Sequence, residues 1–464
     1  LDAATRYVPP VVTPTRAGGF DQKIAIIGAG PAGLSCAFYL AEKGYRPVVF
    51  EKNEHPGGML TYGIPSFKLQ KDVIEAEVEV IRLMGAEFRY GVEVGRDVTL
   101  DELRAQGFKA FYVAIGCQGG RLAGIPGEDA EDVTVAVDFL REVNSGKIDA
   151  LPGRTVVVGG GNVAIDVARN ACRLGSEHVE MFCLESEAQM PASEEERREA
   201  VEDGAHISCG WGPKEIHLDE AGRVCGITFK RCTRVFDDEG RFAPEYDEND
   251  LRRVDADRVV MSIGQSIVWG DLLAGSKVEL GRGQGALADP QTYQTAEPDI
   301  FVGGDVYTGP SFAIDAIAAG HEAAVSIHRF VQPGSTLTIG RNQRRYTSLD
   351  RDDVVLESYD NASREVAHVD REREKAAPFS EYVETFSEEQ VRAETARCLG
   401  CGASIVDPNK CIGCGLCTTK CAFDAIHLDR DRPECSTMVK YEQKLPSLGK
   451  YALKRAIKIK FGKK

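Results

Sequence analysis

The sequence predicts an α/β protein with two Rossmann-like dinucleotide-binding domains, followed by a small α+β domain rich in cysteine. Residues 23–53 and residues 154–185 each show the pattern of a strand, a glycine turn, a helix and a second strand. Each begins with a run of β-branched apolar residues, which is typical of a strand buried on both faces of a parallel sheet. The third observation is that seven of the 14 cysteines lie at or after Cys398.

Composition limits the class of protein. With 464 residues, the chain is long enough for two or three domains with cores of their own. Hydrophobic residues make up 43% of it, and no apolar run approaches the ~18 residues that cross a bilayer. The scattered cysteines before residue 390 indicate a reducing compartment, so a cytoplasmic location is expected. The net charge of -16 disfavours a nucleic-acid partner.

The first glycine turn has the form G-x-G-x-x-G, at Gly28, Gly30 and Gly33. In such a turn the first glycine permits the tight bend, the second lets the backbone approach a pyrophosphate, and the third lets helix and strand pack closely. Glu51 ends the second strand, where a carboxylate can accept hydrogen bonds from a ribose diol. The alternative is a turn that serves packing only, but strand, glycines, helix and acid together favour a dinucleotide site.

The second glycine turn, at Gly159, Gly161 and Ala164, has the form G-x-G-x-x-A and again lies between a strand and a helix. Its second strand ends at Glu185, the acid in the ribose position. A packing turn is again the alternative, and a second dinucleotide site is favoured for the same reasons.

The elements after residue 220 follow from shorter patterns. Residues 222–232 and 256–265 are strand-like, and residues 298–330 indicate a strand, a tight turn and a long helix. Residues 331–385 are charged and lack apolar periodicity, which indicates a linker or a wrapping arm.

A helix is expected again over residues 386–399. Ser387 and Gln390 form a predicted capping box, and Phe386 with Val391 forms a hydrophobic staple. This helix leads to the first of the C-terminal cysteines.

Two further stretches distinguish the first nucleotide site from the second. A glycine pair in "GGMLTYGIPSFKL" (57–69) lets a flat ring system lie close to the backbone. Asp305 follows two glycines in "FVGGDVYTGPS" (301–311), just before a new helix. This arrangement resembles the second half of the FAD site in flavoproteins with two dinucleotide-binding domains. An ordinary turn acid is the alternative for Asp305.

With "AIIGAGPAGLSCAFYL", "VVGGGNVAIDVAR" and "MPASEEE", these motifs resemble the small subunit of glutamate synthase. They resemble equally the large subunit of the electron-bifurcating NADH-dependent ferredoxin–NADP oxidoreductase. The likeness covers about residues 20–335. It implies a glutathione-reductase-type fold, in which the NAD domain is inserted into a discontinuous FAD domain, and hydride transfer between nicotinamide and flavin at the domain interface.

The resemblance implies the following organisation along the chain: FAD-binding domain, 20–130 and 293–335; NAD(P)-binding domain, 131–292; linker or wrapping arm, 336–385; ferredoxin-like [4Fe-4S] domain, 386–436; basic tail, 437–464.

The motifs and the resemblance together give the expected site residues. For FAD they are Gly28, Gly30, Pro31, Ala32, Gly33, Glu51, Lys52, Gly58, Met59, Leu60, Val94, Ala114, Gly116, Gly304, Asp305 and Ala313. For NAD they are Gly159, Gly161, Asn162, Val163, Ala164, Glu185 and Gly264. Hydride transfer depends on positioning more than on acid–base groups, so no catalytic residue is expected.

The chain departs from the family in three ways. The family's N-terminal cysteine-rich helical domain is not found in this sequence, and a ferredoxin-like module follows the nucleotide domains instead. The family also usually shows a Tyr-Arg-Arg run where this chain has Cys183, Leu184 and Glu185. Because those arginines would hold the 2′-phosphate of NADPH, NADH is expected to be preferred.

The C-terminal cysteines predict iron–sulfur clusters. Cys411, Cys414, Cys417 and Cys421 have the C-x₂-C-x₂-C-x₃-C spacing of bacterial ferredoxins. Cys398, Cys401 and Cys435 are further candidate ligands. Because seven cysteines are one short of eight, one cluster and two clusters both stay open, and two are favoured. A disulfide knot or a zinc site is the alternative, although zinc sites more often show paired C-x₂-C units.

These features predict a flavin- and iron–sulfur-containing NAD(H) oxidoreductase subunit that passes electrons between NAD(H), FAD, [4Fe-4S] clusters and a partner subunit or ferredoxin. A route through a cysteine pair near the flavin is disfavoured, because no C-x-x-C precedes residue 398. Two alternatives stay open: the small subunit of glutamate synthase itself, and a non-catalytic scaffold that binds no flavin.

The C-terminal tail is basic, with nine Lys or Arg and one acidic residue from Ser436 to Lys464. Leu453, Ile457 and Phe461 fall on one helical stripe among the lysines. Docking on an acidic partner subunit or on a membrane surface is one interpretation, and a solvated tail is at least as consistent with the pattern.

Overall fold

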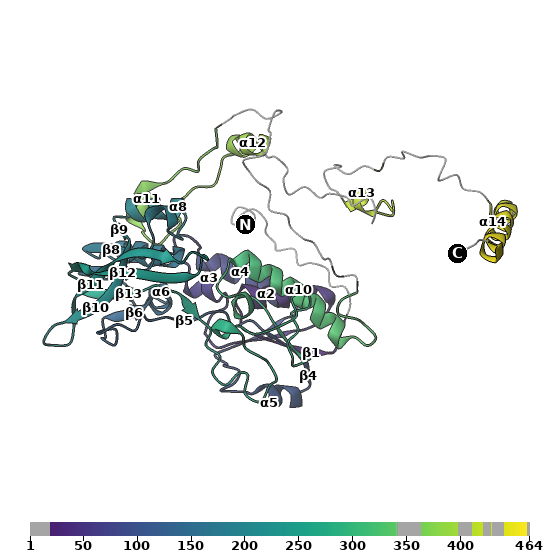
Figure 1. Ribbon diagram of the computed structural model, residues 1–464, viewed down its shortest axis with the longest axis horizontal. Coiled ribbons are helices and arrows are strands. Elements are labelled where there is room, and N and C mark those ends of the chain that lie inside the picture. Colours follow the sequence, from purple (N-terminus) through teal and green to yellow (C-terminus); the bar gives the residue numbers. More distant parts are fainter. Residues whose placement is uncertain are drawn as a thin grey trace. The chain divides into compact units, whose positions relative to one another are not determined.

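A computed structural model of the chain describes residues 19–339, 341, 363–397, 411–420, 428 and 440–461 (Figure 1). The chain divides into two compact units. One comprises residues up to 359 together with 363–391, and the other comprises 360–362 and 392–464. Both dinucleotide-binding domains belong to the first unit.

The first nucleotide domain is built on a five-stranded parallel sheet of order β15-β4-β1-β2-β3. The strands are β1 (Lys23–Ile27), β2 (Val48–Glu51), β3 (Glu87–Tyr90), β4 (Phe108–Val113) and β15 (Ile300–Val302). The last strand returns from far along the chain to pair with β4. The domain is therefore discontinuous, as the resemblance implied.

Alternation of apolar side chains explains why this sheet is covered on both faces. Ile24 and Ile26 of β1 belong to the core under the long helices, whereas Ala25 and Ile27 belong to the core on the opposite face. The helices α2 (Pro31–Lys43) and α10 (Ala313–Val331) pack side by side on the first face, with α4 (Lys71–Leu83) beside α2 (Figure 1). The short helix α5 (Leu100–Ala105) contributes to the opposite core.

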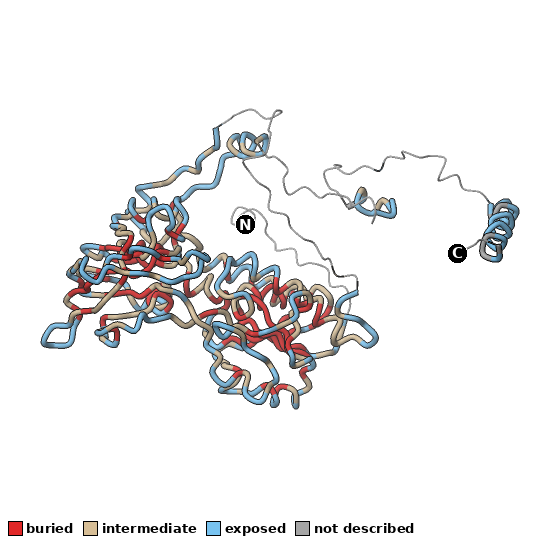
Figure 2. Tube along the Cα trace, in the orientation of Figure 1, coloured by how far each residue is buried: buried red, intermediate tan, exposed pale blue. Residues whose placement is uncertain are grey.

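The second nucleotide domain repeats this plan, with a parallel sheet of order β6-β13-β7-β8-β9. Its strands are β6 (Val133–Val135), β7 (Arg154–Val158), β8 (His178–Cys183), β9 (His206–Cys209) and β13 (Arg258–Met261). One face packs against α6 (Ala136–Asn144), α7 (Asn162–Arg173) and α8 (Glu194–Glu202). Figure 2 shows the buried residues concentrated in two cores, one around each parallel sheet.

The other face of this sheet is covered by an antiparallel sheet, formed by β10 (Trp211–Leu218), β11 (Val224–Phe236) and β12 (Phe242–Val254). Phe182 of β8 stacks on Phe229 of β11 with ring centroids 3.9 Å apart. A short ladder between β5 (Gly119–Gly120) and β14 (Gln265–Ser266) lies where the chain passes between the two domains. Sequence patterns predicted β11 and β13, but they did not predict β12, because six of its 13 residues are charged and it lacks a regular apolar alternation.

Residues 363–384 form an arm that docks on both nucleotide domains. A bridge between Val369 and Val383 closes it, and the short helix α11 (Arg371–Ala376) follows the first of these residues. Phe379 lies against Phe67 of the first domain, with ring centroids 6.4 Å apart. The backbone carbonyl of Pro378 accepts a hydrogen bond of 2.7 Å from Arg173 of α7. Of the two interpretations of this segment, these contacts favour the wrapping arm.

The arm also completes a buried polar cluster in the second domain. Arg169 is 1% exposed and pairs with Glu199 and Asp203. Its Nη2 donates a hydrogen bond of 2.6 Å to the hydroxyl of Tyr382. A buried guanidinium needs its donors satisfied, so the arm stabilises this domain.

We expect Tyr382→Phe to lower the free energy of unfolding of this domain by about 1.5–3 kcal/mol, because the substitution removes a hydrogen bond to a buried charged group. Urea denaturation followed by the circular dichroism of the flavin-loaded chain measures this change. Tyr451→Phe is the matched control, since Tyr451 is 61% exposed and should leave the stability unchanged. Equal midpoints for both variants would contradict this role of the arm.

The described residues after the arm include the helices α12 (Glu388–Ala396), α13 (Leu416–Lys420) and α14 (Tyr441–Phe461). The predicted capping box at α12 is confirmed, because Gln390 N–H donates to Ser387 Oγ and Ser387 N–H donates to Gln390 Oε1. Leu453 and Ile457 of α14 are 66% and 52% exposed. Within the residues described, no helix has the length and apolar character needed to cross a membrane.

Candidate functional site

The first glycine loop connects β1 to α2 and is held by Glu51 at the end of β2. The Glu51 side chain is buried, and its Oε2 accepts a hydrogen bond of 2.8 Å from the backbone N–H of Ala29. Its Oε1 accepts hydrogen bonds from the backbone and the side chain of Asn53. Gly28 has φ +105°, and a Cβ there would lie 2.4 Å from the carbonyl oxygen of Ala114. This position therefore requires glycine.

Gly30 behaves differently, because no protein atom lies closer than 4.0 Å to the position that its Cβ would occupy. Its backbone, at φ -76° and ψ 179°, is one that any residue adopts. Neither the fold nor the dihedral angles demand glycine here, so the space is suited to a ligand. No side chain caps α2, and the N–H groups of its first turn point toward this space, as in dinucleotide-binding loops.

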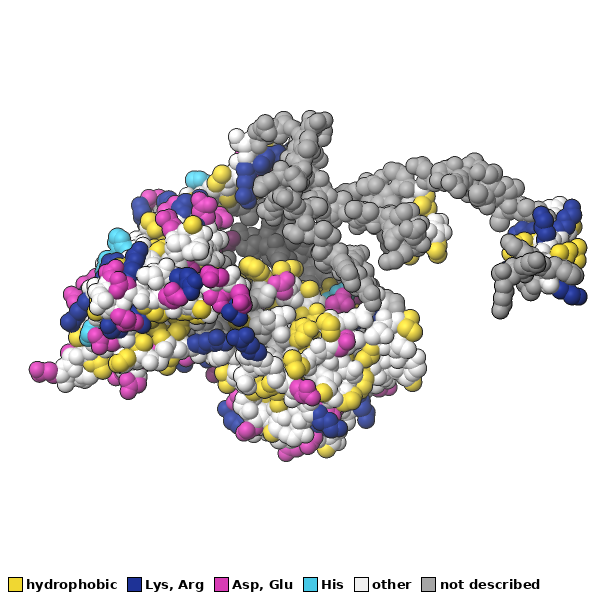
Figure 3. Space-filling model, viewed as in Figure 1, with side chains coloured by type: hydrophobic (Ala, Val, Ile, Leu, Met, Phe, Trp, Pro, Cys, Tyr) yellow, Lys and Arg dark blue, Asp and Glu magenta, His cyan; other side chains and the backbone are white. Residues whose placement is uncertain are grey.

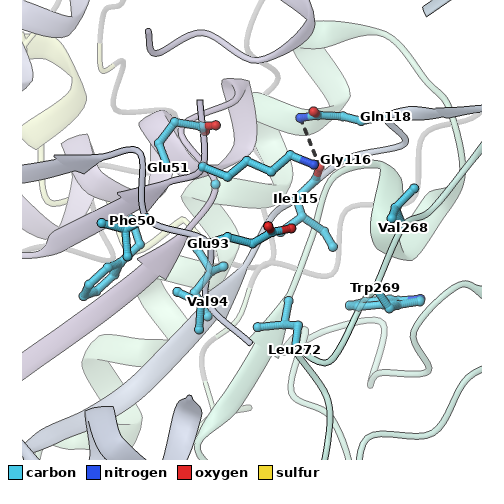
Figure 4. Close-up of a pocket in the computed structure, with 14 residues that line it drawn as sticks. Phe50, Glu51, Glu93, Val94, Ile115, Gly116, Gln118, Val268, Trp269 and Leu272 are labelled. Atoms are coloured by element: carbon cyan, nitrogen blue, oxygen red, sulfur yellow. Dashed lines mark hydrogen bonds between the residues drawn. The ribbon is translucent and has the colours of Figure 1, made fainter. Parts of the chain in front are cut away.

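A narrow pocket lies beside Glu51 (Figure 4). Gly28 of the first loop also lines it. Val94 lines it from the first domain, and Trp269 and Leu272 line it from the segment that returns after β14. Gln118 lies at its edge and donates a weak hydrogen bond of 3.5 Å to the carbonyl of Ile115. A narrow, partly apolar pocket beside a carboxylate that could accept hydrogen bonds from a ribose suits an adenine ring.

A larger pocket extends from Gly30 to the boundary between the two domains. Residues of the first domain line it, namely Gly28, Gly30, Pro31, Ala32, Glu51, Gly58, Met59, Leu60, Ala114, Gly116, Gly304, Asp305, Phe312 and Ala313. Asn162, Val163 and Asp166 line it from the second domain. Loops from both glycine motifs thus meet around one space.

The far end of this pocket is formed by α9 (Asp305–Thr308) and by the start of α10. Burial raises the pKa of the Asp305 carboxyl, and a backbone N–H of Ser311 partly offsets that effect. Phe312 and Ala313 at the start of α10 line the pocket, so the positive end of this helix faces it. No side chain caps this helix end. Phe312 and Ile314 at this helix end are 73% and 66% exposed, and Figure 3 shows hydrophobic side chains on the surface over α10.

Two lysines hold the pocket wall in place, and one of them bridges the two domains. Lys68 of the first domain forms an ion pair with Asp166 of α7 at 2.5 Å and another with Glu196 of α8. Burial raises the pKa of Asp166 to about 6, although Lys68 acts in the opposite direction. Lys71 donates to the carbonyls of Leu60 and Ile64, and burial lowers its pKa to about 8. These bonds position the Met59–Tyr62 helix, α3, which carries part of the pocket lining.

The second glycine loop forms a pocket of its own, lined by Gly159, Gly161, Asn162, Val163, Glu185 and Gly264. Gly159 has φ +145°, and a Cβ there would lie 2.2 Å from the carbonyl oxygen of Ser262. No protein atom lies within 4 Å of the position of a Cβ on Gly161. The two loops therefore share one design, in which the second glycine leaves space that the protein itself does not fill.

Glu185 lies close to this second loop. Its Oε2 is 3.0 Å from the position that a Cβ on Gly160 would occupy. The fold also brings two distant arginines near this strand end. Arg197 donates a hydrogen bond of 2.7 Å to the carbonyl of Glu187, and the guanidinium of Arg231 lies beside Gly210, whose N–H donates to the carbonyl of Glu185. Arg197 is thus a local neighbour of the strand end, although it lies 12 residues beyond Glu185 in the sequence.

Most of the expected FAD and NAD residues line one of the three pockets described above, and two of them serve packing instead. Lys52 and Val94 line the narrow pocket, and the other expected residues line the pockets already described, except Gly33 and Ala164. A Cβ on Gly33 would lie 1.9 Å from the carbonyl oxygen of Gly28, and Ala164 is fully buried. Both therefore serve the packing of helix on strand, which is the role that the third position of the motif predicts.

Sequence reasoning did not identify Gln118, Trp269 and Leu272 as pocket residues. They follow no motif. Trp269 and Leu272 reach the site through the return of the chain after β14, whereas Gln118 lies directly before β5.

The expected cluster ligands are only partly described. Cys411, Cys414 and Cys417 are exposed, at the start of α13 and just before it. Cys398, Cys401, Cys421 and Cys435 lie outside the described residues.

Comparison with known proteins agrees with this architecture. The family model described as pyridine nucleotide-disulphide oxidoreductase matches residues 22–320, and the one described as 4Fe-4S binding domain matches residues 404–427. FprA from Mycobacterium tuberculosis, solved in complex with NADPH, aligns with a TM-score of 0.58 at 20% identity over 67% of this chain and 84% of that chain. Lactococcus lactis thioredoxin reductase aligns with a TM-score of 0.52 at 19% identity, over 67% and 99%. These structures show the fold.

Among the curated relatives is the beta subunit of an NADP(+)-dependent formate dehydrogenase from Moorella thermoacetica, 36% identical over 82% of this chain and 54% of the relative. Another is the small chain of the NADPH glutamate synthase from Escherichia coli K12, 36% identical over 67% of this chain and 69% of the relative. The chain spans about half the length of the first of these relatives. Because the family match extends over more than half of its residues, this chain belongs to the pyridine nucleotide-disulphide oxidoreductase family and carries a 4Fe-4S binding domain after that fold.

Proposed function

We propose that this chain is an electron-transfer subunit of a redox complex, in which electrons pass between NAD(H), FAD, [4Fe-4S] clusters and a partner subunit or ferredoxin. The observation that supports it most strongly is the large pocket that Gly30, Asp305 and Asn162 line from two domains. A flavin held on the first loop would there meet a nicotinamide held on the second. FAD, when bound, exchanges electrons in pairs with a nicotinamide and singly with iron–sulfur clusters.

The residues of the chain supply binding and orientation for this chemistry. The uncapped first turn of α2 and the space at Gly30 suit a pyrophosphate, and Glu51 suits the ribose beside it. The positive end of α10 favours negative charge at the distal end of the pocket. Lys68 holds the two domains together through Asp166 and Glu196, so that the two loops keep facing one space.

Anaerobic purification tests this proposal directly. We expect stoichiometric FAD, iron and acid-labile sulfide, and bleaching of the flavin absorption when NADH is added. A colourless chain that takes up no FAD would support the non-catalytic scaffold instead. Co-purification with a glutamate-forming subunit would support the second candidate, the small subunit of glutamate synthase, which the similarity to the Escherichia coli chain favours.

NADH is the proposed substrate rather than NADPH. The Glu185 carboxylate lies against the second loop, where it can accept hydrogen bonds from a ribose diol but would repel a 2′-phosphate. The nearby arginines are engaged in part. Arg197 donates from Nη1 to the Glu187 carbonyl, although its buried Nε has no hydrogen-bond partner among the described residues, and Arg231 lies over the ring of Trp211. Two of the relatives are named for NADP(+) or NADPH and another is named as NAD-dependent, so the preference varies within the group, and the proposal rests on the residues of this chain.

We expect a preference for NADH of ~2–4 kcal/mol, or roughly 30- to 1,000-fold in kcat/KM, from repulsion and the lost hydrogen bonds together. Leu184→Arg/Glu185→Arg should move the preference toward NADPH. Arg197→Gln serves as the control, because Arg197 is a basic residue near this strand end that the proposal gives no part in nucleotide binding, and this variant should still prefer NADH. A wild type that prefers NADPH, or an Arg197→Gln variant that loses NADPH turnover selectively, would overturn the assignment.

A further inference from the structure

Two cysteines far apart in the sequence meet at the end of the second parallel sheet. Cys183 and Cys209 are the last residues of β8 and β9, and they are direct partners in the register of these strands. Their sulfur atoms are 3.7 Å apart. Neighbouring strands of a sheet lie ~4.8 Å apart, which is within the Cα separation that a disulfide spans. The pair can therefore close without moving either strand out of the sheet.

The two thiols have different surroundings. Cys183 is 3% exposed and lines the pocket of the second glycine loop. Cys209 is half-buried and lines a separate surface depression, together with Arg231 and Arg234. A solvent-borne oxidant therefore has access to Cys209, whereas Cys183 is reached only through Cys209 or through the nucleotide pocket. Burial also raises the pKa of the Cys183 thiol, which keeps it protonated.

Cys183 is in contact with the groups that form the nucleotide site. Its Cβ lies 2.8 Å from the position of a Cβ on Gly160, in the glycine loop. Its thiol donates a weak hydrogen bond of 3.7 Å to the carbonyl of Glu185. The same carbonyl accepts a hydrogen bond of 2.9 Å from the N–H of Gly210, the residue after Cys209. The two cysteines thus flank the backbone hydrogen bond that positions Glu185.

We propose that Cys183 and Cys209 form a redox-active dithiol, which a hydroperoxide converts to a disulfide, and that this disulfide weakens nucleotide binding at the second glycine loop. In the first step the Cys209 sulfur attacks the peroxide, the O–O bond breaks and the thiol proton passes to the leaving oxygen, which gives a sulfenic acid and one molecule of water or alcohol. In the second step the Cys183 thiol displaces water from this sulfenic acid and forms the S–S bond. Hydrogen peroxide is reduced to two waters, and two thiols are oxidised to one disulfide.

Closure has a direct structural consequence at the nucleotide site. A disulfide bond is about 2.05 Å long, so the two sulfurs must approach each other from 3.7 Å. The Cys183 thiol also loses the proton that it donates to the Glu185 carbonyl. Both changes act on the strand end that carries Glu185, so the ribose would lose its well-placed partner.

This inference rests on the proposed function only in naming the nucleotide as NAD(H), and the experiment separates the two. The full chain is treated with hydrogen peroxide, its free thiols are alkylated, and its peptides are mapped by mass spectrometry. The NADH dissociation constant is then measured by fluorescence, before oxidation, after it and after reduction with dithiothreitol. We expect a Cys183–Cys209 cross-link and an increase in the dissociation constant of about 10-fold that dithiothreitol reverses. If the untreated chain does not bind NADH, the proposed function is wrong. The peptide map then decides by itself whether the Cys183–Cys209 cross-link forms.

Two variants complete the test. Cys209→Ser should bind NADH as the wild type does and should lose its sensitivity to peroxide. Cys225→Ser is the matched control, because Cys225 is also half-buried in the same domain but donates to the carbonyl of His217, and it should keep the sensitivity. Peptides alkylated at both Cys183 and Cys209 after peroxide treatment would overturn the inference. So would a cross-linked chain that binds NADH with unchanged affinity.

Discussion

Replacement of Gly30 by valine is expected to abolish FAD binding and to leave the fold intact. The nearest protein atom to a Cβ at this position is the Cα of Gly58, at 4.0 Å, and the backbone angles suit a β-branched residue. The substitution therefore meets little resistance from the protein. It fills the space that a pyrophosphate needs to reach the N–H groups of α2. Loss of these charge-assisted hydrogen bonds should cost about 4 kcal/mol, or roughly 1,000-fold in affinity.

The second loop supplies a matched variant for this experiment. Gly161 has the same place in its motif, extended backbone angles of φ -92° and ψ 173°, and no protein atom within 4 Å of its Cβ position. Gly161→Val should therefore retain FAD but lose NADH binding, whereas Gly30→Val should lose FAD. Flavin content after anaerobic purification and NADH titration by fluorescence measure both effects, with circular dichroism as the check on folding. A Gly30→Val chain that retains stoichiometric FAD would sink the assignment of the first loop.

The glycine motifs allowed the sequence to predict the fold and the central part of both candidate sites, because the first glycine of each motif answers a local requirement. Gly28 and Gly159 have positive φ and abut a backbone carbonyl, and such constraints leave a signature in the sequence. The discontinuity of the first domain was predictable only through the resemblance, since the pairing of β15 with β4 joins segments that no local pattern connects.

The rest of the site depends on contacts between segments far apart in the chain. Trp269 and Leu272 line the narrow pocket, and Lys68 reaches across to Asp166, without any regular spacing that a sequence could show. The cysteine pair of the second domain is another contact between distant segments. A C-x-x-C motif is local, whereas Cys183 and Cys209 become neighbours only through the register of β8 and β9. No C-x-x-C motif precedes residue 398, yet two thiols lie close together beside the second glycine loop.

Removal of residues 398–464 is expected to separate flavin reduction from onward electron transfer. This truncation deletes all seven C-terminal cysteines but keeps α12, whose Gln390 contacts Glu365 and Val366 in the arm. The two nucleotide domains lie in the other compact unit. The shortened chain should therefore keep its FAD and its rate of flavin reduction by NADH. Its transfer to a ferredoxin acceptor should fall by at least about 100-fold, because clusters held by thiolates supply the single-electron steps.

A single substitution makes the same test without removing the module. Cys414→Ser removes one thiolate of the C-x₂-C-x₂-C-x₃-C run, and we expect the electron paramagnetic resonance signal of the reduced clusters to diminish or disappear while flavin reduction continues. Cys172→Ser is the control, since Cys172 lies on α7 and far from this motif in the sequence, and both signals should persist. Two clusters, as proposed, require about eight iron atoms per wild-type chain, whereas one requires about four. If the truncated chain reduced ferredoxin at the wild-type rate, electrons would leave the flavin directly, and the proposed route through the C-terminal module would be wrong.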